Sequence, residues 1–269
     1  AGPQGARRAG GQGSRRVGIA LAMATPRTPG GPPPAPPVQK LQVRYAKRGR
    51  LRFASTRGFQ RALERALRRT GLPVAFSAGF HPHPRISYAN AASTGTASEA
   101  EYVEISLTER VDPDTVRAAL DDALPEGLDV LECREAGRGA LADRLQASVW
   151  EVRFHDVDPR VVSDAVDRFL AVDRAEVTRM GKSGLRTFDT RGAVVAMRVI
   201  DAGCAILRVV ARHTTPGVRP DDILSALRAL GGLESPAPPL VTRLAQGPLQ
   251  SESASVADPL APDENVAGA

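Results

Sequence analysis

The sequence pattern that most constrains the fold is an amphipathic helix predicted between Ser55 and Gly71, in the block STRGFQRALERALRRTG. At 3.6 residues per turn, its apolar and basic side chains separate onto opposite faces. The apolar face carries Phe59, Leu63, Ala66 and Leu67, and the basic face carries Arg57, Arg61, Arg65 and Arg68. Ser55 suits the N-cap position and Gly71 suits the C-terminal end. The helix must therefore pack one side on another layer and turn a row of arginines outward.

Period-two alternation predicts strands around this helix. Apolar and polar residues alternate over 41–45 and again over 51–53, which indicates one long bent strand or a hairpin turning at Arg48 and Gly49. The chain continues with predicted strands at 73–77, 102–107 and 128–133, and with a helix that opens at Asp112 and Pro113. The predicted order of elements in this half is therefore β-α-β-β-α-β.

The second half repeats this order. Its predicted elements are a strand at 150–154, a helix at 159–172, a short strand at 176–179, a hairpin formed by 194–199 and 205–211, a helix at 220–230 and a strand at 240–244. We therefore expect an α+β protein made of two tandem ferredoxin-like (β-α-β-β-α-β) units with disordered N- and C-terminal tails.

Composition divides the chain into four segments. Residues 1–37 are rich in Gly, Pro and Arg and predict a disordered extension, within which Met23 is a candidate native start. Residues 38–137 predict the basic ferredoxin-like domain, and residues 138–246 predict the second one. Residues 247–269 predict a disordered acidic tail, so that folded structure is expected only between the two ends.

Targeting signals and cysteine usage favour a cytoplasmic protein. The segment SRRVGIALAMA looks like a twin-arginine signal, but its apolar run of about eight residues is short for an exported protein. No apolar run is long enough to span a bilayer. Cys133 and Cys204 are isolated, so we expect neither a disulfide framework nor a cysteine-held metal, and no cofactor.

The charge distribution favours a polyanionic partner. The formal net charge is +6, and nearly every charged residue between positions 47 and 69 is basic. Arginine binds phosphate through two parallel hydrogen bonds, so aligned arginines suit a nucleic-acid backbone. The alternative is a solvated helix face in an arginine-rich protein. The predicted nucleic-acid-binding residues are Lys47, Arg48, Arg50, Arg57, Arg61, Arg65, Arg68 and Arg85.

The loop GFHPHPR, at residues 79–85, is a second candidate site. Its two prolines favour extended backbone, which would place His81 and His83 on the same side. These imidazoles could contact a ligand, or act with Glu101 as a catalytic acid–base pair, or belong to a structural turn. Two histidines make an incomplete metal site, which Glu99 and Glu101 would have to complete, and we expect no metal.

A third, smaller signal is the sequence GKSG at 181–184, which resembles a phosphate loop only superficially. A Walker motif would need glycine at position 176, where this chain has Glu176. Arg179, Lys182 and Arg186 could still form a secondary anion site.

The block from RYAKRGRLRF to EYVEI resembles a bacterial family known as radical-SAM-linked proteins, a family of unknown function. The resemblance covers roughly residues 38–245 and is to the stand-alone actinobacterial form of this domain. The matching loop and strand residues are Gly79, Phe80, His81, His83, Pro84, Glu101 and Tyr102. The family usually shows Ser-His followed within two residues by Asp, whereas here Thr56 follows Ser55 and Gly58 stands where Asp is expected. The radical-SAM cysteine motif CxxxCxxC is absent, which argues against a radical enzyme.

Together these patterns predict a cytoplasmic RNA-binding accessory protein that is not an enzyme on its own. We expect it to act on tRNA or ribosomal RNA together with a separate enzyme of modification or processing, either a radical-SAM enzyme, as the resemblance implies, or a ribonuclease. Two alternatives remain open. One is an RNA-modifying or RNA-cleaving enzyme that uses His81 and His83, and the other is a protein-interaction adapter.

Overall fold

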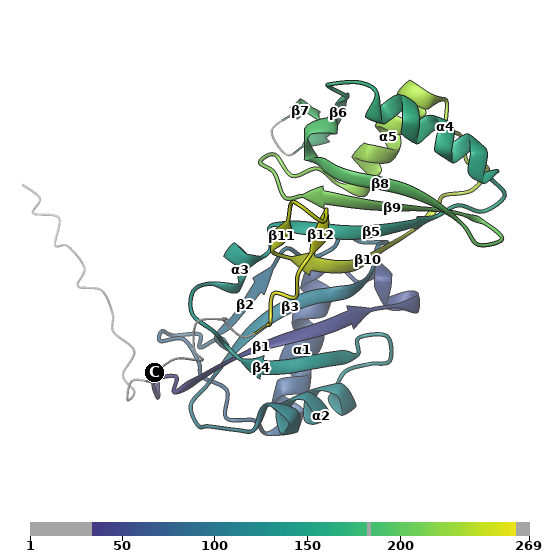
Figure 1. The fold of residues 1–269 in the computed structure, drawn as a ribbon. Helices are drawn as coiled ribbons and strands as arrows, with labels where there is room; N and C mark the ends of the chain where they lie inside the picture. Colours follow the sequence, from purple (N-terminus) through teal and green to yellow (C-terminus); the bar gives the residue numbers. More distant parts are fainter. Residues whose placement is uncertain (1–33, 182–183, 262–269) are drawn as a thin grey trace, which may run out of the picture. The chain divides into compact units, whose positions relative to one another are not determined.

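Eight strands of this chain join into a single mixed sheet (Figure 1). The computed structural model describes residues 34–181 and 184–261. Along the sheet the order is β4-β1-β3-β10-β5-β9-β8, and β2 pairs with β3 beside this path. The predicted extension before residue 34, the candidate start Met23, Lys182 of the GKSG sequence and the last eight residues lie outside the described parts.

The first half supplies four strands, two helices and one 3-10 helix. They are β1 (Gln39–Lys47), η1 (Gly49–Phe53), α1 (Thr56–Thr70), β2 (Ile86–Ala89), β3 (Ala97–Leu107), α2 (Pro113–Ala123) and β4 (Val130–Glu135). Their sheet order is β4-β1-β3-β2, and all three pairs are antiparallel. The helix predicted at Asp112 is confirmed, since this residue caps α2 by accepting a hydrogen bond from Thr115 N at 2.9 Å.

The second half supplies the remaining elements. They are α3 (Leu141–Arg144), β5 (Ala147–Arg153), α4 (Pro159–Leu170), β6 (Glu176–Gly181), β7 (Gly184–Asp189), η2 (Arg191–Ala193), β8 (Val194–Asp201), β9 (Ala205–Arg212), α5 (Pro220–Gly231), β10 (Leu240–Gly247), β11 (Leu249–Gln250) and β12 (Ser255–Val256). Here the sheet order is β10-β5-β9-β8, again antiparallel throughout. The hairpin β6–β7 is separate from the large sheet.

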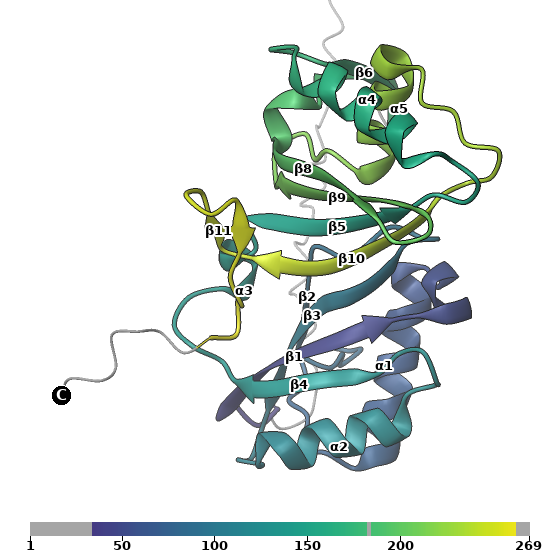
Figure 2. The ribbon, with the colours of Figure 1, turned by 45° about the vertical axis from the view of Figure 1, so that its right-hand side comes forward.

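Strand β3 joins the two halves. One of its edges pairs with β1 along most of its length, and its other edge is divided between two partners. Residues 102–105 pair with β2, and residues 97–98 pair in parallel with β10. Figure 2 shows β10 lying between β5 and β3, at the centre of the stack of strands. A long central strand therefore makes one continuous sheet out of two sets of four strands.

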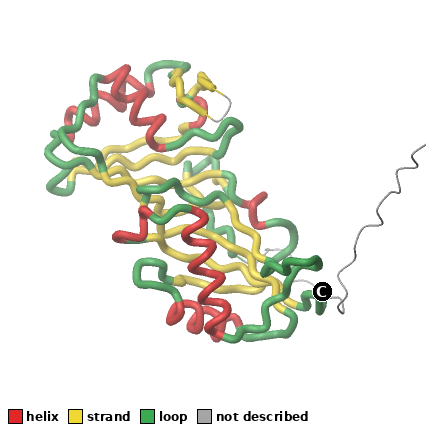
Figure 3. Tube along the Cα trace, turned by 180° about the vertical axis from the view of Figure 1, so that it is seen from behind, coloured by secondary structure: helices red, strands yellow, loops and turns green. Residues whose placement is uncertain are grey.

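The helices of both halves cover the same face of this sheet. Tyr45 on β1 stacks on Phe59 of α1, with ring centroids 4.1 Å apart, and lies directly opposite Glu101 of β3. Glu101 pairs with Arg243 of β10, whose guanidinium lies 5.2 Å from the ring centroid of Trp150, in the core beneath α4 and α5. Because all these side chains project from one face, α1 and the helices of the second half lie on the same side of the sheet. Figure 3, seen from behind Figure 1, shows α1 in front of the strands.

Two predicted strands of the first half take other forms. Residues 49–53 form the 3-10 helix η1, because Gly49 has a φ of +50° and the Arg48 amide donates to Gly127 O at 2.8 Å, which turns the chain out of the β1 direction. Residues 73–77 make only isolated bridges, to Leu107 and to Pro84, since they lie between two different partners. The second strand is instead β2, which the alternation of apolar and polar residues did not predict.

Two further differences lie in the second half. Strand β7 was not predicted, although it pairs with the predicted β6 across six residue positions. Folded structure also continues beyond residue 246, where the sequence predicts a disordered tail. Strands β11 and β12 form a short hairpin, and Leu260 is buried in an apolar cluster with Tyr102 and Leu141. Arg144 reinforces this contact by donating to Pro259 O at 3.2 Å.

The close approach of α4 and α5 depends on Gly231. A Cβ atom at this position would lie 2.4 Å from the Cβ of Ala165, which is fully buried on α4. We predict that Gly231→Ala lowers the free energy of unfolding by about 1–3 kcal/mol, the usual cost of overpacking, although alanine is the better helix former. Urea unfolding measures the change. The exposed Ser225→Ala on the same helix is the control and should stay within about 0.5 kcal/mol; equal losses in both variants would contradict this packing.

Candidate functional site

Helix α1 carries the predicted row of outward-facing arginines. Ser55 caps it by accepting a hydrogen bond from Gly58 N at 3.1 Å, and Gly71 ends it in the left-handed conformation with a φ of 65°. The buried residues are Phe59, Ala62, Leu63, Ala66 and Leu67. The four predicted arginines are exposed, and we call them the arginine face: Arg57, Arg61, Arg65 and Arg68. With 1.5 Å of rise per residue, this face extends for about 16 Å.

None of the arginine-face side chains forms an ion pair with any residue that the structure describes. The same holds for Arg50 and Arg85, which are also exposed. Glu64 lies on the same helix but pairs with none of them. The six guanidinium groups are therefore free to bind an anion from solution.

The other two predicted basic residues are already engaged. Lys47 is only 4% exposed, and its Nζ donates to the carbonyls of Ala92 and Ser93 at 3.1 Å each. Burial lowers the pKa of Lys47, although nearby Glu101 opposes this shift. Arg48 pairs with Glu99 and with Asp129, the latter at 2.7 Å. Lys47 is therefore not on the surface, and Arg48 is exposed but has its charge paired.

A buried ion pair between Glu101 and Arg243 lies at the joint of the two halves, and both side chains are at most 3% exposed. The second carboxylate oxygen of Glu101 accepts from Ala92 N at 3.0 Å. Arg243 also donates to Gln246 Oε1 at 3.3 Å and to Ser98 Oγ at 3.4 Å. These bonds satisfy both charges inside the protein. No local sequence pattern points to Arg243, because its partner Glu101 lies 142 residues away along the chain.

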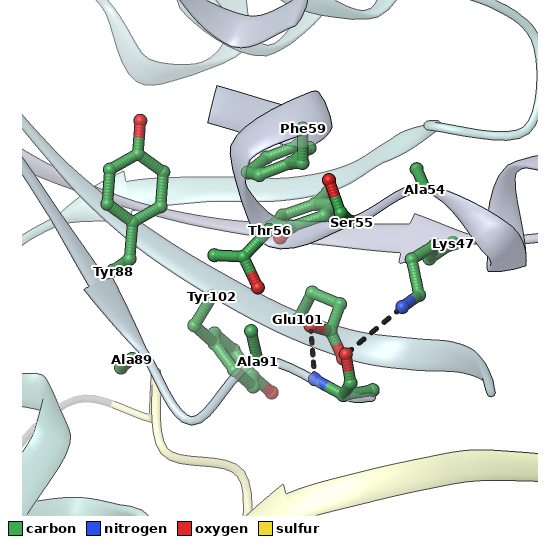
Figure 4. Close-up of a pocket in the computed structure, with 12 residues that line it drawn as sticks. Lys47, Ala54, Ser55, Thr56, Phe59, Tyr88, Ala89, Ala91, Glu101 and Tyr102 are labelled. Atoms are coloured by element: carbon green, nitrogen blue, oxygen red, sulfur yellow. Dashed lines mark hydrogen bonds between the residues drawn. The ribbon is translucent and has the colours of Figure 1, made fainter. Parts of the chain in front are cut away.

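A small pocket opens beside this pair at the N-terminus of α1 (Figure 4). Figure 4 shows Thr56 and Tyr88 around it, and the hydrogen bonds that join Lys47 and Glu101 to the segment after Ala91. Tyr45 also lines the pocket, and burial together with the charge of Glu101 raises its pKa well above the usual value. Its hydroxyl has no hydrogen-bond partner within the described parts of the chain.

A larger cleft adjoins this pocket and lies between the two halves, with a volume of about 580 Å³; we call it the joint cleft. Residues 90–94 form one wall, residues 213–214 and 217–220 form the other, and Trp150 and Arg243 contribute between them. Its remaining lining residues are Thr56 and Arg179. The N-termini of α1 and α5 both reach it, through Thr56 and Pro220.

His213 is held in one orientation at the wall of the joint cleft. Its Nδ1 donates to Leu145 O at 2.6 Å, so its Nε2 accepts from Ser148 Oγ at 2.8 Å. Desolvation lowers the pKa of His213, the bond to Leu145 O opposes this shift, and the charge of Arg243 adds to it. The neutral imidazole is therefore the favoured form in the folded protein.

The histidines of the GFHPHPR loop are exposed and do not contact Glu101, their predicted acid–base partner. The loop closes through bonds from Ser77 N to His83 O and from Arg85 N to Ala75 O, both 2.8 Å long. His81 and His83 are exposed at its tip, and neither contacts Glu101, whose carboxylate is bound to Arg243. Within residues 34–181 and 184–261, no group of three His, Cys, Asp or Glu side chains is arranged to hold a metal ion.

Comparison with known proteins places the chain in a family. The model of the family described as an uncharacterized protein conserved in bacteria (DUF2344) matches residues 40–220, and the chain belongs to this family. No curated protein matches it. Among solved structures, a chain described as an unknown protein from Galdieria sulphuraria is 16% identical, with 71% of this chain and 91% of that one covered. The TM-score of 0.22 is too low to indicate a shared fold.

Among the helices in the described parts of the chain, none is long and apolar enough to cross a membrane.

The buried ion pair predicts an asymmetric response to mutation. Arg243→Met leaves the Glu101 carboxylate buried without its main partner and should lower the free energy of unfolding by about 3–5 kcal/mol. The double variant Glu101→Gln/Arg243→Met removes both charges and should recover part of this loss. Urea unfolding of all three proteins measures the effect. A double variant no more stable than Arg243→Met would show that the pairing of charge is not what matters at the joint.

His213 predicts a pH dependence of stability. Because its pKa is lower in the folded protein than in the unfolded chain, protonation favours unfolding. The free energy of unfolding should therefore fall as the pH drops below about 6.5 and level off below the folded pKa. Denaturation between about pH 8 and pH 5, compared with His213→Gln, isolates this contribution from the carboxylates. Identical pH profiles for the two proteins would contradict it.

Proposed function

We propose that this protein binds structured RNA through the arginine face of α1 and presents it to a separate enzyme of tRNA or ribosomal RNA modification or processing. The observation that carries the proposal is the row of four exposed guanidinium groups without an ion-pair partner in the described residues. Regular spacing of cations over about 16 Å suits contact with several successive phosphates. Arg50 and Arg85 extend the cationic set beyond the helix.

The contrast with the rest of the surface supports this reading over that of a solvated face. Elsewhere many arginines are paired with carboxylates, as Arg48 is with Glu99 and Arg208 is with Glu151. The apolar side of α1 packs on the core, so the arginine side chains on the opposite side of the helix face solvent. A surface that concentrates unpaired arginine on one helix favours a phosphate-bearing partner.

We further propose that each half is a ferredoxin-like unit and that the protein acts in the cytoplasm. The strand orders β4-β1-β3-β2 and β10-β5-β9-β8, each with two helices on one face, support the first part. The resemblance to radical-SAM-linked proteins supports a radical-SAM enzyme as the partner, and a ribonuclease is the other candidate. In either case this chain supplies RNA binding and the partner supplies the chemistry.

RNA binding is tested by the triple variant Arg61→Ala/Arg65→Ala/Arg68→Ala. We predict weaker binding to folded tRNA and a slope of log affinity against log salt that is reduced by about 2–3, roughly one for each lost phosphate contact. Fluorescence anisotropy over a salt series measures both quantities.

The matched control removes three exposed arginines from the second half, Arg160→Ala/Arg198→Ala/Arg228→Ala, and lowers the net charge equally. It should change the salt slope by less than about one. Equal affinity and slope for the wild type and the α1 variant would refute the proposal, and equal losses in both variants would reduce it to a general effect of net charge.

A further inference from the structure

We propose that the joint cleft binds a phosphate-bearing nucleotide, taken from an unpaired stretch of the RNA that lies on α1. This inference rests on the proposed function for the origin of the nucleotide, but the cleft can be tested alone. Its volume of about 580 Å³ is in the range of small-ligand sites in proteins.

The charge of the cleft favours an anion. Its lining includes Arg179, Arg219 and Arg243 and no carboxylate residue. Two nearby carboxylates are already bound, since Asp222 pairs with Arg179 and Glu101 pairs with Arg243. The Arg219 side chain is exposed and makes no ion pair within the described chain. A positive charge thus faces the cleft without compensation, which suits a phosphate group.

Unused hydrogen-bond donors also reach the site. Trp150 is 9% exposed, yet no described residue accepts from its indole N–H, and its side chain lines the cleft. The backbone N–H groups of Thr56 and Arg57, in the first turn of α1, are likewise without an acceptor in the described chain, and helix N-termini favour anions. Thr56 and Arg57 are exposed, so their N–H groups are open to solvent, and a ligand with acceptor oxygens can take the place of water on these donors.

The walls offer what the rest of a nucleotide needs. The Thr94 hydroxyl can bond the edge of a base or the ribose. The Thr214 hydroxyl donates to Pro216 O at 2.8 Å and keeps its lone pairs for a ligand, and the Asn90 amide, whose Nδ2 lies 3.2 Å from His213 Nδ1, keeps its Oδ1. Val218 and Ala91 supply apolar surface for a sugar or base face. Proteins that recognise RNA commonly take unpaired bases out of the stack into sites of this kind.

The position of the cleft connects it to the arginine face. Thr56 lines the cleft, and the next residue, Arg57, is the first member of that face. A strand whose phosphates follow α1 from Arg68 towards Arg57 therefore arrives at the cleft at the N-terminus of the helix. The two surfaces can hold successive parts of one RNA.

Trp150 gives a direct readout, because it is the only tryptophan in the chain. Titration of the full chain with adenosine monophosphate should change its fluorescence in a saturable way, and inorganic phosphate should do so at least about tenfold more weakly. No saturable change with either ligand would overturn the proposal. Equal affinity for phosphate and adenosine monophosphate would overturn the assignment of a nucleotide.

The variant that tests the assigned contact is Arg219→Gln, since this exposed side chain is not required for the core. Loss of one charge-assisted hydrogen bond should weaken adenosine monophosphate binding about tenfold or more. Arg160→Gln, an exposed arginine on α4 away from the cleft, is the matched control and should bind as the wild type does. Equal binding by the two variants would contradict the role of Arg219.

The two proposals fail separately. Arg219→Gln should lose the preference of the protein for RNA with an unpaired end over blunt duplex, and its salt slope should fall by no more than about one, the share of a single lost phosphate contact, against about 2–3 for the triple α1 variant. The triple α1 variant should keep its affinity for adenosine monophosphate. If the triple α1 variant keeps this affinity and also binds RNA as tightly as the wild type, the proposed function fails and the nucleotide site remains. If the wild type and Arg219→Gln show the same preference for RNA with an unpaired end, the cleft proposal fails.

Discussion

The ion pair between Glu101 and Arg243 is the contact on which the joint of the two halves depends. Each charge has left water, so each requires the other to remain stable inside the protein. Glu101 comes from β3 and Arg243 from β10, and the parallel pairing of these strands brings Ser98 and Arg243 into register. The ion pair thus fixes where the second set of strands attaches to the first, because charge-assisted hydrogen bonds of arginine require a specific geometry.

This attachment decides which surfaces the protein can use. Because both helix layers lie on one face of the sheet, the N-termini of α1 and α5 border the same cleft, with Arg243 and Trp150 between them. The arginine face looks outward from that layer. The arginine face remains unpaired within the described chain, whereas Arg179 and Arg243, at the joint, are bound by carboxylates. In the function that we propose, the arginine face would contact several phosphates and the joint cleft would hold one nucleotide.

Local patterns predicted the helices well and the strands less completely. Helices α1, α2, α4 and α5 follow from 3.6-residue periodicity and their caps, because each helix makes its hydrogen bonds within a few residues. Strand β2 was not predicted, and residues 73–77 were predicted to form a strand but make only isolated bridges. The reason is that a strand forms only where another segment pairs with it. The same reason hides β7, which lies between Gly184 and Asp189 and depends on β6.

The candidate site shows the same division. The sequence alone determined the arginine face, because the helical period places Arg57, Arg61, Arg65 and Arg68 opposite the apolar residues whatever the helix packs against. Only the tertiary structure decided that Lys47 is buried and that Arg243, on a distant strand, is the partner of Glu101. Whether a charge is solvated, paired or buried depends on groups that are distant in the sequence and close in the fold, and a local sequence pattern does not predict such contacts.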